Sequence, residues 1–118
     1  MISKAVIERD DFIDLSKEAR LLYFFLCINA DDEGFIGNAR GLMRMQGIEE
    51  KALDELKASR YAIKFKNGVI VVTHWHIHNS IRKDRRKTTE HLDEQARLNI
   101  TDGGEYEIKQ EERGTVET

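Results

Sequence analysis

Three histidines, His74, His76 and His78, alternate with apolar residues in the stretch THWHIH. On a β-strand the three imidazoles would share one face, and imidazole is a common zinc ligand. The first and third would lie about 13 Å apart along a straight strand, which is too far for one ion. The pattern therefore favours a strand with Trp75 and Ile77 packed in the core and the histidines on the outer face. We expect no metal site, although these imidazoles could still contact phosphate.

A run of basic residues follows the histidines directly. In a helix, residues of like charge four positions apart repel each other by a few tenths of a kcal/mol per pair. Contacts to the phosphates of a polyanion would offset this cost through counterion release and forked guanidinium donors. The alternative is a solvated connector. The predicted DNA-binding residues of this run are Arg82, Lys83, Arg85, Arg86 and Lys87.

The net charge of −3 conceals a strong segregation of charge. Residues 1–34 carry four basic against eight acidic residues, and residues 88–118 carry three against nine. Residues 35–87 carry twelve basic against five acidic residues. Such a layout indicates a basic binding surface between acidic ends. Lys64 and Lys66, near a predicted hairpin tip, would extend this surface, and Arg40 and Arg44 could join it.

Other chemistry finds little support in the sequence. Asp31, Asp32 and Glu33 cluster, but the ligand spacing of a calcium loop is absent, and a polar turn explains them. The serines lack elbow glycines, and no glycine-rich phosphate loop occurs. Cys27 is the only cysteine, which excludes intramolecular disulfides and CxxC zinc sites. We therefore expect neither an enzyme nor a cofactor; the competing hypothesis is a metal-dependent hydrolase built on His74 and His76.

The composition indicates one domain in 118 residues, with 40% hydrophobic and 35% charged residues. A membrane helix needs about 20 apolar residues, and the longest apolar run, LLYFFLCI, is far shorter. That run is also not N-terminal, so no signal peptide is visible. We expect a cytoplasmic protein without a membrane partner.

The first part of the chain shows helical periodicity. SKAVIERDDFIDLS could be an extended arm or strand, after which Ser16 is a plausible N-cap for a helix over residues 17–29. Residues 21–28 are apolar almost all round, which predicts a helix central in the core. A short extended piece at Phe35 and Ile36 is followed by two helices. The first is NARGLMRMQG, from Asn38 to Gly47, and the second is the amphipathic IEEKALDELKASR, residues 48–60.

The period then changes to that of strands. YAIKFKNGVIVVTHWHI alternates apolar and polar residues around Asn67-Gly68, the strongest short-range hairpin signal. Further on, the sequence predicts a helix that begins at Thr88 or Thr89 and runs to about Leu98, and TDGGEYEI predicts a small turn. The polar tail after Ile108 is expected to be loose.

This order of elements predicts an α+β fold of the winged helix-turn-helix type. Three helices form its core, the β-hairpin is the wing, and a helical extension follows. We divide the chain into a winged-helix domain with its basic end (1–87), a helix-and-turn extension (88–108) and an acidic, disordered tail (109–118). The second helix of the helix-turn-helix exposes mainly acidic residues, so affinity should come from the wing and the basic run, with weak sequence specificity.

Three stretches, ADDEGF, GVIVVTHW and above all HWHIHNSIRKDR, resemble the N-terminal region of Gram-positive phage and prophage replisome organisers. These proteins are relatives of DnaD-like primosome proteins, and the resemblance spans roughly residues 5–108. It implies a winged-helix domain that binds DNA, duplex or single strand, at a phage origin. It also implies a homo-oligomer that helps to bring the replicative helicase or its loader to that site.

Carried over residue by residue, the resemblance assigns Trp75 and Ile77 to packing. It makes His78, Asn79, Arg82, Lys83 and Arg85 candidates for DNA contacts or structural polar contacts. Such proteins usually continue into a C-terminal helical domain, whereas this chain stops near residue 118. Helicase contacts would therefore use a region absent here. The alternatives are a winged-helix assembly module and a transcriptional regulator without a role in replication.

Overall fold

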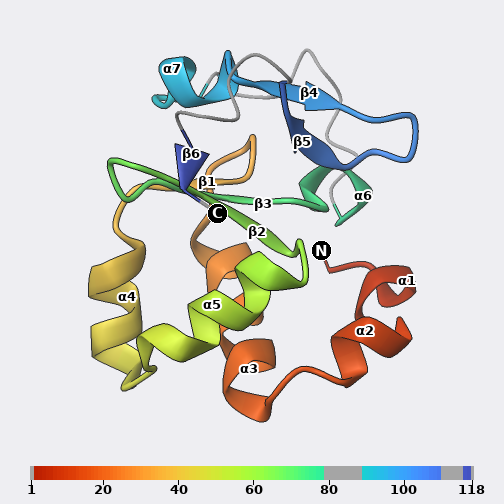
Figure 1. Cartoon of the computed structure of the whole chain (residues 1–118), viewed down its shortest axis with the longest axis vertical. Coiled ribbons are helices and arrows are strands. Elements are labelled where there is room, and N and C mark those ends of the chain that lie inside the picture. The colour runs from red at the N-terminus through yellow and green to blue at the C-terminus, as the bar shows by residue number, and fades with distance from the viewer. Residues whose placement is uncertain (1, 79–88, 110–115, 118) are drawn as a thin grey trace.

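The computed structural model describes residues 2–78, 89–109 and 116–117, which form a compact α+β fold (Figure 1). The α+β class predicted from the sequence is confirmed. Helices and strands are α1 (Lys4–Ile7), α2 (Asp10–Ile13), α3 (Lys17–Asn29), β1 (Phe35–Ile36), α4 (Ala39–Gln46), α5 (Glu50–Ala58), β2 (Ala62–Phe65), β3 (Ile70–Val72), α6 (Trp75–His78), α7 (Leu92–Gln95), β4 (Leu98–Ile100), β5 (Tyr106–Ile108) and β6 (Val116–Glu117).

The molecule has three layers. A four-stranded antiparallel sheet of order β1-β3-β2-β6 crosses the middle. Helices α3, α4 and α5 lie on one side of it, while α7 and the two-stranded β4–β5 sheet lie on the other (Figure 1). The short helices α1 and α2 lie beside α3. One hydrophobic core joins these layers, since it contains residues of the helices, of the central sheet and of both strands of the second sheet.

Helix α3 begins where the sequence predicts. The Ser16 hydroxyl oxygen accepts a hydrogen bond from the Ala19 N–H, which satisfies one of the unpaired donors of the first turn. The expectation that this helix is central in the core is wrong for one of its faces. Leu22 and Leu26 are fully buried, but Leu21 is 46% and Ile28 is 72% exposed. The helix therefore has a buried apolar face and an exposed one.

The next two helices and the hairpin are also confirmed. Gly47, with φ +66°, ends α4 in the left-handed conformation that favours glycine. Ile48 and the α5 residues Ala52, Leu53 and Leu56 are buried. In the β2–β3 hairpin the Asn67 side-chain oxygen accepts a hydrogen bond from the Val69 N–H. β3 also pairs with β1, which joins the short extended piece to the hairpin.

The N-terminal stretch is helical, so its prediction as an extended arm is wrong. The Ser3 carbonyl accepts hydrogen bonds from the amides of Val6 and Ile7, and the Arg9 carbonyl accepts from Phe12 and Ile13. These single turns bury Val6 and Phe12 against the core. Each turn is too short to show a helical period, which explains the error.

The predicted helix from residue 88 or 89 to Leu98 is also wrong, because within residues 89–98 only the single turn of α7 is helical. Leu98 begins a hairpin in which β4 pairs with β5, with Leu98 opposite Ile108. Leu98 and Tyr106 are buried in the common core. The sequence predicts a disordered tail from residue 109. The structure pairs Val116–Glu117 with β2, and residues 110–115 and 118 lie outside the described residues.

Candidate functional site

The histidine-rich stretch is not the returning strand of the hairpin. β3 ends at Val72, and the Thr73 N–H then donates to the Tyr61 carbonyl. The Thr73 carbonyl accepts from the Tyr106 N–H, while the His74 carbonyl starts the helical turn α6 by accepting from His78. The predicted strand with three histidines on its outer face is therefore wrong. Bonds to a strand 33 positions further along outweigh the local β pattern.

His74 lies in the interior, with only 3% of its surface exposed. Its Nε2 atom is 3.1 Å from the Arg9 Nη1 atom and 3.6 Å from the Glu105 carboxylate. The Tyr61 ring lies against the imidazole, at 4.9 Å between centroids. Burial is the main cause that lowers the pKa of His74, although the Glu105 charge opposes this effect. The neutral ring can then accept the Arg9 hydrogen bond.

His78 is also buried, with 7% of its surface exposed. Its Nδ1 atom accepts a hydrogen bond of 2.8 Å from the Ser3 N–H. In the neutral ring Nε2 must then carry the proton, which it donates to the Tyr23 hydroxyl. Burial, followed by the nearby His74, lowers the pKa of His78 to about 4. Since both ring nitrogens are engaged, a phosphate contact from His78 would require these two bonds to break.

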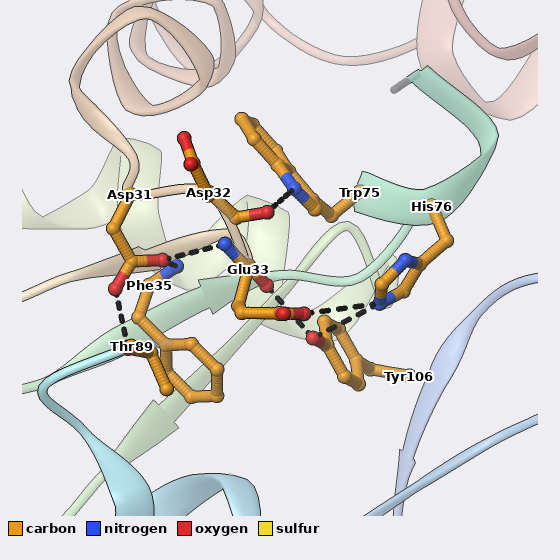
Figure 2. A network of polar contacts seen from close by, with 8 residues as sticks. All are labelled: Asp31, Asp32, Glu33, Phe35, Trp75, His76, Thr89 and Tyr106. Atoms are coloured by element: carbon orange, nitrogen blue, oxygen red, sulfur yellow. Dashed lines mark hydrogen bonds and ion pairs between the residues drawn. The ribbon is translucent and has the colours of Figure 1, made fainter. Parts of the chain in front are cut away.

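The acidic residues 31–33 and Gly34, which we call the acidic turn, connect the end of α3 to β1 (Figure 2). The Asp31 Oδ1 atom accepts hydrogen bonds from the amides of Glu33 and Phe35, at 2.9 and 3.0 Å. Its Oδ2 atom accepts from the Thr89 hydroxyl. The Asp31 carboxylate therefore organises the turn and fixes Thr89, in agreement with the predicted polar turn.

The backbone of the same turn binds α6 and β5. The Trp75 indole N–H donates to the Asp32 carbonyl at 2.9 Å, and the Tyr106 hydroxyl donates to the Glu33 carbonyl at 2.7 Å (Figure 2). The His76 Nε2 atom lies 3.1 Å from the Tyr106 hydroxyl and 3.9 Å from the Glu33 carboxylate. Together with Thr89, α6 and β5 thus bring three segments of the chain to this turn.

Gly34 permits this close approach. Its φ is +94°, and a Cβ atom at this position would lie only 2.7 Å from the Trp75 Cγ atom. Any other residue would therefore meet both backbone strain and a clash with the indole. Trp75 is buried as predicted, and Ile77 packs against the core.

The acidic turn fixes the residues on both sides of the basic run. α6 ends at His78 and is bound to the turn through Trp75, while the next described residue, Thr89, is bound to Asp31. We call residues 79–88 the basic segment. The predicted DNA-binding residues Asn79, Arg82, Lys83, Arg85, Arg86 and Lys87 belong to it and lie outside the described residues.

The two predicted hairpin lysines differ in their surroundings. The Lys64 Nζ atom, on β2, lies 3.7 Å from the Glu50 carboxylate, so part of its charge is compensated. Lys66 is exposed beside the hairpin turn. That turn is held in place because the Asn67 side-chain amide donates to the Glu94 carboxylate of α7 at 2.6 Å. Arg40 and Arg44, the further basic candidates, are exposed on α4.

The outward face of α5 is acidic, as the sequence predicts. Glu50, Lys51, Asp54 and Ala58 are exposed. Glu55 accepts hydrogen bonds from both the N–H and the hydroxyl of Ser16, which lower the pKa of its carboxyl group. This face offers more carboxylates than cations to an approaching polyanion.

A cleft of about 490 Å³ lies next to the acidic turn, with walls that include Asn29, Asp31, Asp32, Phe35, Glu90 and His91. The sequence gives no sign of it, because its walls come from three separate segments. Three carboxylates make it unsuitable for phosphate. Within residues 2–78, 89–109 and 116–117, no group of three His, Cys, Asp or Glu side chains is placed to hold a metal ion. The described helices are all too short or too polar to cross a membrane.

Sequence reasoning missed the partners of the histidines. Arg9, Tyr23, Glu105 and Tyr106 are distant in the sequence and belong to no motif, so no local signal could have identified them.

No family model, curated protein or solved structure matches this chain.

Proposed function

We propose that the chain is a DNA-binding protein whose basic segment contacts the phosphate backbone. One observation carries the proposal: the acidic turn fixes the residues on both sides of a segment with five cations in six positions. Holding both ends of such a segment lowers the entropy that is lost when it binds a polyanion. Lys66 beside the hairpin turn would add a further cation.

We also propose that residues 17–72 form a winged helix. The order α3, β1, α4, α5, β2 and β3, with β1 paired to β3, agrees with three helices followed by a β-hairpin wing. The hairpin is short, with strands of four and three residues, so Lys66 would be the main contribution of its tip. Because the exposed face of α5 is acidic, the phosphate contacts would give weak preference for sequence.

A role in the initiation of phage or prophage replication rests on the resemblance to replisome organisers. In that role the protein would form a homo-oligomer on origin DNA. It would also help to bring the replicative helicase or its loader to that site. The chain would act by binding, without a catalytic step and without a cofactor.

Fluorescence anisotropy of a labelled duplex and of its single strand, over a series of salt concentrations, tests DNA binding. In the variant Arg82→Ala/Arg85→Ala/Arg86→Ala three phosphate contacts are lost. The slope of log Kd against the logarithm of the salt concentration should therefore decrease in magnitude by about 2–3. A matched control removes three lysines elsewhere, at Lys4, Lys51 and Lys109. Normal binding by the first variant, or equal losses in both, would contradict the proposed contact surface.

A second candidate function is a protein assembly module. The observation that favours it is the acidic exposed face of α5, together with the pairing of Lys64 to Glu50. The basic segment would then dock on an acidic region of another subunit. Light scattering after size exclusion would show a discrete oligomer, and the triple alanine variant would dissociate it in the absence of DNA.

A further inference from the structure

Helix α3 has two apolar faces, of which one is fully buried and the other is only partly covered by the fold. At about 100° per residue, the buried residues Ala19, Leu22, Tyr23 and Leu26 form one face. Leu21, Phe24, Phe25 and Ile28 form a second stripe, centred about 160° from the first. We call it the outer stripe of α3.

The outer stripe is substantially open to solvent. Leu21 is 46% and Ile28 is 72% exposed, whereas Phe24 and Phe25 are half-buried. Phe24 is held in place by the Phe12 ring of α2, at 5.9 Å between centroids in an edge-to-face arrangement. In Figure 1, α5 lies across α3, and these two helices are in contact. Phe24 and Phe25 also pack against the core, so the exposed ends of the outer stripe are Leu21 and Ile28. Exposed apolar side chains on one face of a helix mark an interaction surface.

We propose that the outer stripe binds the same stripe of a second copy of this chain, with the two α3 helices antiparallel about a two-fold axis. The spacing of the residues is what selects this partner. An axis between Phe24 and Phe25 places Leu21 of each copy opposite Ile28 of the other, and Phe24 opposite Phe25. Every exposed apolar side chain then has an apolar counterpart, as a self-complementary two-fold interface requires.

The charges at the two ends of α3 favour the same arrangement. Lys17 is exposed at the N-terminal end of the outer stripe, while Asp31 and Asp32 follow the C-terminal end. In the antiparallel arrangement each Lys17 lies opposite the acidic pair of the other copy. The helix dipoles also attract each other in this orientation, since each positive N-terminus meets a negative C-terminus. A parallel arrangement would instead place Lys17 against Lys17 and each acidic pair against the other.

This inference does not depend on DNA binding, so oligomeric state and DNA affinity can be measured separately. Sedimentation of the full chain without DNA should show a dimer. Ile28→Asp should weaken the dimer by at least about 100-fold, because a carboxylate in an apolar contact is left without a partner. Ile100→Asp, at a 55% exposed isoleucine of β4, is the matched control and should remain dimeric. A monomeric wild type, or a dimer unaffected by Ile28→Asp, would overturn the proposal.

Disulfide crosslinking tests the register. In a Cys27→Ala background, Leu21→Cys and Ile28→Cys chains should crosslink efficiently when mixed, and neither should crosslink alone. In the antiparallel pair, identical positions are displaced by about 10 Å along the axis, beyond the reach of a disulfide. Crosslinking of either single variant with itself in preference to the mixture would contradict the antiparallel register. Unchanged sedimentation of the Arg82→Ala/Arg85→Ala/Arg86→Ala variant would show that the dimer is independent of the basic segment.

Discussion

Two regions of this molecule are held together by different forces. Residues 17–72 pack through apolar side chains, with Leu22, Leu26, Leu56, Phe65 and Val72 completely buried. The junction between the acidic turn, α6 and β5 depends instead on hydrogen bonds between residues far apart in the sequence. Trp75 binds Asp32 across 43 positions, and Tyr106 binds Glu33 across 73. The first region supplies a stable core, and the second determines where the basic segment leaves and rejoins it.

The largest expected effect belongs to the apolar region. Phe65→Ala removes a fully buried ring from the centre of the sheet and should lower the free energy of unfolding by about 3–5 kcal/mol. Urea denaturation followed by circular dichroism would measure this loss. A loss below about 1 kcal/mol would show that Phe65 does not belong to a tightly packed core.

The buried histidines His74 and His78 should make the protein sensitive to acid. The pKa of His78 is lowered to about 4, so the unfolded chain binds a proton near pH 6.5 while the folded protein does not. Stability is therefore constant above about pH 6.5 and falls as the pH decreases toward 4, by up to about 3 kcal/mol for this residue. The lowered pKa of His74 acts in the same direction.

Urea midpoints between pH 7.5 and pH 4 would test this dependence. The variant His78→Gln removes the titrating group and should show a shallower loss of stability over the same range. Equal pH dependence in the variant and the wild type would indicate that other groups cause the acid sensitivity. A stability that increases on acidification would contradict the buried, neutral state of His78.

Substitutions at two glycines separate the stability cost of backbone strain from the cost of lost packing at the junction. Gly34 and Gly68 have φ values of +94° and +91°, but only Gly34 lies against another side chain, that of Trp75. Both substitutions to alanine should cost about 1 kcal/mol through strain. Gly34→Ala should cost about 1–3 kcal/mol more, because its methyl group clashes with the indole. Equal thermal shifts in the two variants would contradict the close packing of the acidic turn on α6.

The apolar region could be predicted from the sequence because its signals are local. The Ser16 cap, the Gly47 stop, the α5 periodicity and the Asn67-Gly68 hairpin each depend on residues a few positions apart. The exception is α3, whose residues 21–28 are apolar almost all round but whose outer stripe is only partly covered. Hydrophobicity alone cannot distinguish burial in the core from burial by another molecule.

The junction could not be predicted, because its decisive contacts are distant. THWHIH has a strand period, yet the Tyr106 backbone and the Asp32 carbonyl fix a turn and a helix there. The sequence predicts a polar turn at the acidic residues 31–33, which the structure confirms, but nothing in it indicates that Thr89 is the partner of Asp31. The basic segment was evident from composition alone, whereas the residues that fix its two ends became visible only in the fold.

The most direct test of the account is the duplex affinity of Asp31→Ala, measured by anisotropy at one fixed salt concentration beside Asp14→Ala. Both variants lose one negative charge, and Asp14 is exposed at the end of α2. If charge alone mattered, both would bind DNA equally well or more tightly than the wild type. We predict that Asp31→Ala, which loses the bond to Thr89, binds about tenfold more weakly, while Asp14→Ala does not. Equal or tighter binding by a folded Asp31→Ala protein would contradict the role of the acidic turn in positioning the basic segment.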